Sequence, residues 1–189
     1  MLLESTVHLF VVDPDLSLGS PAADHCRMDM HITYANFDRS ILEQIDEHYD
    51  LLVLDWGLDA PDARGVLDTV RQHAPDTRIL ALTTDVPATD PIDRGADEFL
   101  VEPVTDETLY RTIERLALQK TYEETMSEFY RLATERALLQ TELESAVDAA
   151  DQYQSVTREL DECRERAAAI RDELSSDEFD RALRQLLDD

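Results

Sequence analysis

Glycine and proline are confined to one part of this chain. The sequence has four glycines and seven prolines in 189 residues, and all of them lie at or before Pro103. The remaining residues, 104–189, contain neither. Because Gly and Pro are the residues that interrupt helices, a segment of this length without them can form long helices. This change in composition after Pro103 predicts two domains. The boundary is placed at residue 120, giving domains 1–120 and 121–189, because the last helix of the first domain extends beyond Pro103.

Five short apolar runs in the first domain have the length and composition of buried strands. They are residues 7–12, 30–35, 51–54, 78–82 and 98–101. Apolar residues recur at helical spacing between them, as in Val66, Leu67 and Val70. Strands that alternate with helices predict an α/β domain with a parallel, doubly wound sheet and helices on both faces. We expect the strand order 2-1-3-4-5.

The sequence predicts some of the helices between these strands more clearly than others. The first is expected to be short or broken, because Gly19 and Pro21 fall within it. The last is expected to follow Thr105, whose hydroxyl can cap it. Apolar residues mark the second helix and the last helix: Ile41, Leu42 and Ile45 in one, and Leu109, Ile113 and Leu116 in the other.

The second domain is expected to be helical, with a coiled-coil seam. Apolar and small residues recur in steps of three and four over residues 132–153 and again over 156–174, with a three-residue skip between the two runs. Ser175 and Glu178 form a capping box that predicts a short final helix. The pattern leaves open whether the helices pair within one chain or form a homodimer.

Acidic residues greatly outnumber basic ones. The chain has 43 acidic and 17 basic side chains, a formal net charge of −26, and Lys120 is its one lysine. A dense carboxylate surface retains water and cations in molar salt, where screening also reduces self-repulsion. The composition is typical of a cytoplasmic protein of an extreme halophile and disfavours direct nucleic-acid binding. Nothing in the sequence has the pattern of a signal peptide or a membrane span.

Oxygen-bearing side chains follow three of the predicted strands. Asp13 ends the first strand, Asp55 the third and Thr83 the fourth. Ligands of open parallel sheets bind beyond the carboxyl ends of the strands, and neighbouring strands lie about 4.8 Å apart. Carboxylate oxygens bind Mg²⁺, and a carboxylate can attack phosphorus. The three residues therefore predict a Mg²⁺-dependent phosphoryl site, the alternative being that each acid only caps its strand.

Four motifs resemble those of the receiver domain of two-component response regulators. They are FVVDPD, LLVLD, ILALTT and FLVEPV, within a resemblance that covers about residues 5 to 120. The resemblance implies that Asp55 is the phosphoacceptor, that Asp13 is a Mg²⁺ ligand and that Thr83 contacts the phosphoryl group. It also implies a sensor histidine kinase or another signalling protein as partner. Receivers phosphorylate and dephosphorylate themselves only weakly, so the protein is not expected to be an ordinary enzyme.

Two substitutions depart from the receiver pattern. Pro14 stands where a second acidic metal ligand is usual, and Asp15 is one position further along. Glu102 stands where the family has the lysine that offers a cation to the phosphoryl group. Two like charges about 5 Å apart repel by roughly 3 kcal/mol at an effective dielectric constant near 20. We favour a degenerate receiver that signals by binding alone; the competing explanation makes Glu102 a cation ligand in molar salt.

The second domain is similar to the HalX domain, which follows receiver domains in haloarchaeal regulators. The similarity lies in the segments YEETMSEFYRLATERALLQTELE and SSDEFDRALRQL. Together the two resemblances imply a signal-transduction protein, a phosphorelay receiver with a helical output that acts through protein contacts.

Two other functions are weighed against this one. The first is a transcription regulator that contacts DNA, which the net charge disfavours, because residues 104–189 carry 22 acidic and 11 basic side chains. The second is an aspartate-based phosphohydrolase. Asp13 and Asp15 have the spacing of such a catalytic pair, but that function leaves Asp55 unexplained.

Overall fold

The computed structural model describes residues 6–13, 16, 28–35, 45, 48–56, 60–84, 91–142 and 148–174. The chain forms two compact units, Leu3–Lys120 and Thr121–Asp189, which we describe separately. The expected first helix, nearly all of the second and the capping box at residues 175–178 fall outside the described residues. Within the described residues, no helix is both long enough and apolar enough to cross a bilayer.

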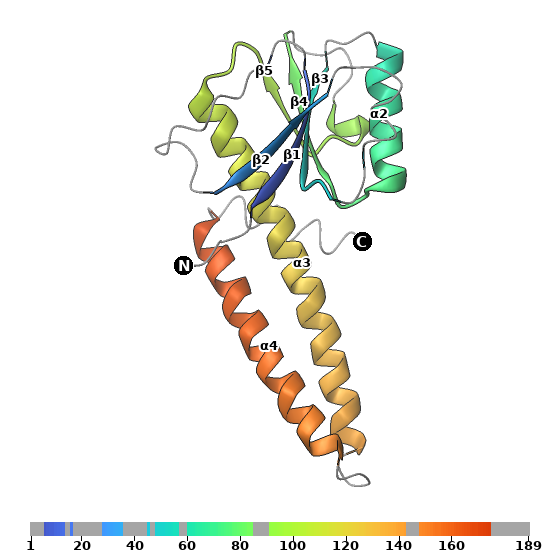
Figure 1. Ribbon diagram of the computed structural model, residues 1–189, viewed down its shortest axis with the longest axis vertical. Coiled ribbons are helices and arrows are strands. Elements are labelled where there is room, and N and C mark those ends of the chain that lie inside the picture. The colour runs from blue at the N-terminus through green and yellow to red at the C-terminus, as the bar shows by residue number, and fades with distance from the viewer. Residues whose placement is uncertain are drawn as a thin grey trace. The chain divides into compact units, whose positions relative to one another are not determined.

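The first unit is built on a five-stranded parallel sheet (Figure 1). Its strands are β1 (Val7–Val12), β2 (Met30–Tyr34), β3 (Leu51–Asp55), β4 (Arg78–Thr83) and β5 (Glu98–Val101). The order is β2-β1-β3-β4-β5, and every neighbouring pair is parallel. The predicted fold class and strand order are confirmed, and each strand lies within one residue of its predicted bounds.

One face of this sheet packs against α2 (Ala60–His73). Successive residues of a strand point to opposite faces, so every second residue of the central strands enters this core. The buried residues of the cluster include Phe10, Val12, Leu52, Leu54, Ile79 and Ala81 from the sheet, with Val66, Leu67 and Val70 from α2. The helix ends at His73, two residues before Pro75, which cannot continue a helix.

A buried carboxylate joins α2, β4 and the segment before β5. Asp97 accepts hydrogen bonds from Arg71 at 2.8 Å, from Arg78 at 2.8 Å and from the backbone N–H of Ile79 at 2.7 Å. The segment before β5 contains a single 3-10 turn, η1 (Ile92–Arg94), which ends at Gly95 with φ of 100°. That left-handed conformation favours glycine, and the Gly95 carbonyl accepts from Arg71.

The last helix of the first unit begins where the sequence predicts. α3 (Asp106–Glu142) follows Thr105, whose hydroxyl oxygen accepts a hydrogen bond from the backbone N–H of Thr108 at 3.2 Å. The three predicted apolar positions, Leu109, Ile113 and Leu116, are all buried. The helix continues into the second unit because residues 104–142 contain neither glycine nor proline.

The second unit contains the rest of α3 and α4 (Asp148–Glu173), which lie side by side (Figure 1). Leu132 of α3 packs with Val156, Leu160 and Cys163 of α4 in a buried cluster. The Cys163 thiol donates to the Thr125 carbonyl at 3.1 Å. The predicted seam therefore joins two helices of the same chain, and the skip after residue 153 does not interrupt α4.

Candidate functional site

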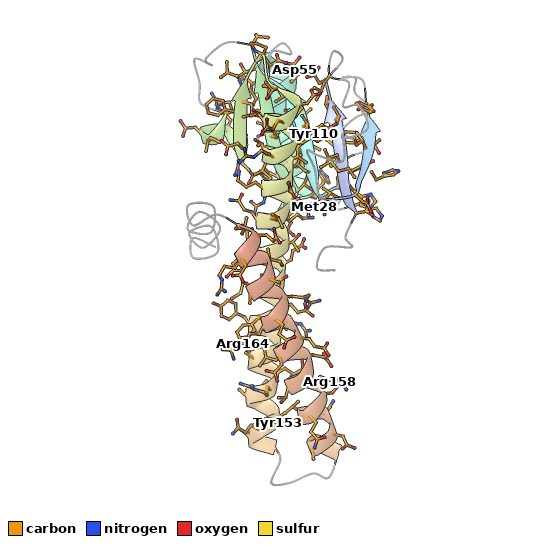
Figure 2. The ribbon with its side chains drawn as sticks, turned by 90° about the vertical axis from the view of Figure 1, so that its left-hand side faces the viewer. Met28, Asp55, Tyr110, Tyr153, Arg158 and Arg164 are labelled. Atoms are coloured by element: carbon orange, nitrogen blue, oxygen red, sulfur yellow. The ribbon has the colours of Figure 1, made fainter. Side chains whose placement is uncertain are left out.

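The register of the two central strands brings the two predicted aspartates together. Val12 of β1 pairs with Leu54 of β3, and Asp13 and Asp55 are the next residue in each strand. Because the strands run parallel and in phase, both carboxylates lie at the carboxyl edge and alternate to the same face. Asp13 is buried, with 8% of its surface exposed, and Asp55 is half-buried. Figure 2 shows Asp55 at one end of the sheet and Met28 towards the other.

Backbone hydrogen bonds hold the neighbouring strand ends at the same edge. The Trp56 N–H donates to the Leu82 carbonyl at 2.6 Å, and the Glu102 N–H donates to the Thr83 carbonyl at 2.8 Å. Thr83 is buried and Glu102 is half-buried. The sheet therefore gathers the residues expected at this edge from four consecutive strands, apart from Asp15, which lies outside the described residues.

Asp13 also contacts the loop that follows its strand. Its Oδ1 accepts a hydrogen bond from the backbone N–H of Leu16 at 3.0 Å. A short side chain that accepts from a backbone N–H a few residues later is a common way of shaping such a turn. The strand-capping role that the sequence left as an alternative is thus present in the structure, alongside the alignment with Asp55.

The described residues fit a divalent cation only in part. Asp13 and Asp55 offer the carboxylate oxygens that Mg²⁺ prefers. No group of three or more His, Cys, Asp or Glu side chains within the described part of the chain could hold a metal ion. Mg²⁺ usually keeps several waters and needs only one or two carboxylates. The described side chains thus supply two candidate ligands and no complete cage.

The one lysine of the chain is engaged elsewhere. Lys120 Nζ forms an ion pair with Asp50 Oδ1 at 2.6 Å, and both side chains are at least two-thirds covered. Asp50 precedes β3, whereas Asp55 ends it. Five residues of strand separate the two acids by roughly 16 Å. Lys120 therefore does not replace the cation that Glu102 fails to supply. The 70 residues between the partners leave no local signal of this pair in the sequence.

Three histidines meet at the opposite edge of the sheet, which the sequence did not predict. The ring of His8 lies 5.4 Å from that of His31 and 6.0 Å from that of His48, measured between centroids. His8 and His31 are paired in the register of β1 and β2. The three are far apart in sequence, so only the strand register could have indicated the cluster.

The helical unit matches a known family. Residues 118–183 match the family model described as "HalX domain". The chain contains a HalX domain. A curated protein of Haloferax volcanii, named as a candidate transcriptional regulator, is 27% identical over 136 residues. The alignment covers 69% of this chain but only 23% of that protein, so the chain spans about a quarter of the relative's length.

The unit that precedes the HalX domain has the receiver fold. The signal receiver domain of a candidate Luxo repressor protein of Vibrio parahaemolyticus superposes with a TM-score of 0.50 and 19% identity, covering 64% of this chain and 96% of that one. NtrX of Brucella abortus, solved with ADP, gives a TM-score of 0.54 and 21% identity over 69% of this chain and 30% of that one. Identities this low establish the fold alone.

Proposed function

We propose that this protein is a signal-transduction regulator, in which the receiver unit takes up a signal and the HalX helices pass it on by contact with other proteins. One observation supports the proposal above the others, the in-register placement of Asp13 and Asp55 at the carboxyl edge of β1 and β3. Acids at this edge can take part in phosphoryl chemistry. On this proposal Asp55 is the residue that a phosphodonor would modify, and no separate substrate is turned over.

We further propose that the receiver is degenerate. Pro14 removes one carboxylate from the expected metal ligands, and Glu102 adds a negative charge at the edge where a phosphoryl group would arrive. The one lysine is held by Asp50 at the opposite edge. Each feature weakens the binding of a doubly charged anion, because repulsion at this edge is opposed by no fixed lysine. The unit then signals through binding of a partner without phosphorylation.

The phosphorylation step is tested with a small-molecule phosphodonor, Mg²⁺ and intact-protein mass spectrometry in molar KCl. We expect no added phosphoryl group on the wild-type chain. The double variant Pro14→Asp/Glu102→Lys restores both groups of the receiver pattern, and we expect it to gain one phosphoryl group. Adding Asp55→Asn to that variant should abolish the gain.

Two results of this experiment would contradict the proposals. A phosphoryl group on the wild-type chain that disappears in Asp55→Asn would show an active receiver, and the degenerate interpretation would be wrong. If the double variant also stays unmodified, the two substitutions are not what disables the site. A site that takes phosphate on neither chain would remove the main support for the receiver function itself.

DNA contact remains the second candidate, because the Haloferax relative is named as a candidate transcriptional regulator. The charge of the helical part opposes it. Residues 104–189 carry 22 acidic and 11 basic side chains, a net charge of −11. DNA-binding surfaces are instead strongly positive, since they neutralise phosphates. We therefore place protein contact ahead of DNA contact. The phosphohydrolase alternative ranks below both, because it gives no role to Asp55.

A further inference from the structure

α3 carries a second seam on the side that α4 does not use. We define the outer stripe by its six residues, Ser127, Tyr130, Thr134, Ala137, Leu138 and Thr141, all of which are exposed. Five of them follow the three- and four-residue steps of a coiled-coil seam, and Leu138 flanks it. Tyr130 is 60% exposed and Leu138 is 63% exposed, although large apolar side chains on a helix of a stable monomer usually face its core.

The two threonine hydroxyl groups of the outer stripe are bonded to their own helix. Thr134 Oγ1 donates to the Tyr130 carbonyl at 2.9 Å, and Thr141 Oγ1 donates to the Leu138 carbonyl at 2.7 Å. Each threonine hydroxyl thus donates its one hydrogen atom to an acceptor within α3. A hydroxyl satisfied in this way can enter a dry interface with little loss, because it leaves no donor unpaired. The outer stripe is therefore more apolar than its composition indicates.

The outer stripe also lies in a neutral part of a strongly acidic chain. Residues 126–141 contain two acidic and two basic side chains, whereas the chain as a whole has a net charge of −26. Three of these four charges are paired: Arg131 with Glu135 at 3.2 Å, and Glu128 with Arg166 of α4 at 2.7 Å. Arg136 lies on the seam side and is half-buried. A second molecule with the same charge meets least repulsion at such a surface.

The outer side of α4 has a different character. Its exposed residues between positions 158 and 165 are mostly charged: Arg158, Glu159, Asp161, Glu162, Arg164 and Glu165. Figure 2 shows Arg158 and Arg164 on α4. A charged helix face is well solvated without a partner. Of the two exposed helix faces, the outer stripe of α3 is therefore the one expected to pack against another protein surface.

We propose that the outer stripe is a self-association surface, through which two copies of the chain pair α3 against α3 in antiparallel sense. The small residues Thr134 and Ala137 lie between the two large ones, Tyr130 and Leu138. An antiparallel, two-fold arrangement places the large residues of each copy against the ends of the other stripe and the small residues at its centre. The two hairpins then form a four-helix arrangement.

The test is sedimentation velocity of the full chain in molar KCl, over roughly a hundredfold range of concentration because a stripe this short implies a modest affinity. We expect the wild-type chain to shift from monomer to dimer as its concentration rises. Leu138→Glu should stay monomeric over the whole range. Ala150→Glu, which adds the same charge at an exposed position of α4, should dimerise like the wild type. Circular dichroism checks that both variants keep their helices.

Three outcomes would overturn the proposal. The wild-type chain could remain monomeric throughout the range. Leu138→Glu could dimerise as well as Ala150→Glu does, which would place the contact elsewhere. The full chain could be monomeric while a chain that ends at Leu174 dimerises, which would make the C-terminal residues the occupant of the outer stripe.

Discussion

At the scale of single residues, two partly buried carboxylates make several of the hydrogen bonds and ion pairs that hold the first unit together. Asp97 holds two arginines and a backbone N–H, and Asp50 holds the chain's one lysine and the backbone N–H of His8. Each guanidinium group gives Asp97 one hydrogen bond, Arg71 to Oδ2 and Arg78 to Oδ1, and the ammonium group of Lys120 makes a point contact with Asp50. Neither set could be predicted, since their members are 18 to 70 residues apart.

Removing the Asp97 carboxylate should destabilise the first unit. Asp97→Ala leaves Arg78, which is mostly buried, and the Ile79 N–H without their shared acceptor. Breaking a buried, hydrogen-bonded pair costs about 3 kcal/mol, so we expect the free energy of unfolding to fall by that amount. Urea unfolding at constant KCl measures it. Asp93→Ala, at an exposed position in η1, should change the free energy by less than about 0.5 kcal/mol. Equal midpoints for the two variants would contradict the assigned role.

The residues of the candidate site were predictable for a simple reason. A strand that ends in an acid is visible in the sequence, and the parallel order then fixes which strand ends are neighbours. Asp13, Asp55, Thr83 and Glu102 reach one edge on that basis. The hydrogen bond from the Leu16 N–H to Asp13 was not predictable, because it depends on the path of a loop that no periodic pattern describes.

At the scale of elements, the spacing of apolar residues predicted that the helices of the second domain form a pair. It did not predict whether both helices belong to the same chain. Seam residues such as Leu132 and Leu160 repeat at coiled-coil spacing whether the second helix belongs to the same chain or to another. A turn between α3 and α4 is marked by neither glycine nor proline. The reversal therefore has no sequence signal of the usual kind, and the contact between Cys163 and Thr125 is what reveals the hairpin.

The packing of the α3–α4 pair should make its stability sensitive to alkaline pH. Burial raises the pKa of Tyr122 above 10.0, and the charge of Arg171 opposes that rise. The folded state thus favours the neutral phenol. The associated stability is complete below about pH 10 and is lost as the pH rises towards the folded-state pKa, because the unfolded chain ionises first.

We therefore expect thermal unfolding, followed by far-UV circular dichroism, to move to lower temperature as the pH rises above about 10. Tyr122→Phe should show a smaller decline than the wild type over that range, because it has no phenol to ionise. Tyr153→Phe changes a ring of α4 that is not among the groups acting on Tyr122, and it should decline like the wild type. If all three proteins lose stability in parallel, burial of Tyr122 is not the cause.

At the scale of the whole molecule, the main feature is the net charge, which follows from the composition and not from the fold. The chain has 43 acidic and 17 basic side chains, so its net charge of −26 remains even if every basic side chain is paired with an acid. The remaining repulsion acts over the Debye length, which is about 10 Å in 0.1 M salt and 3 Å in 1 M salt. Stability should therefore depend on salt for the chain as a whole.

Raising KCl from about 0.1 M to 1 M should raise the urea midpoint of unfolding, since screening weakens self-repulsion in the folded state. Screening is nearly complete by about 1 M, so a further rise at higher salt would report exclusion of salt from the protein surface. Sucrose at matched osmolality provides a control, because it is excluded without screening. A midpoint that responds equally to KCl and to sucrose would count against electrostatic repulsion.

The position of Trp56 has a practical consequence. It is the chain's one tryptophan, it directly follows Asp55, and it packs against the core of the sheet while its backbone N–H bonds to Leu82. The protein thus carries a single indole fluorophore, directly beside Asp55. A cation or an anion that binds next to Asp55 alters the local field on the indole, and tryptophan emission reports that binding without a dye and without background from a second indole.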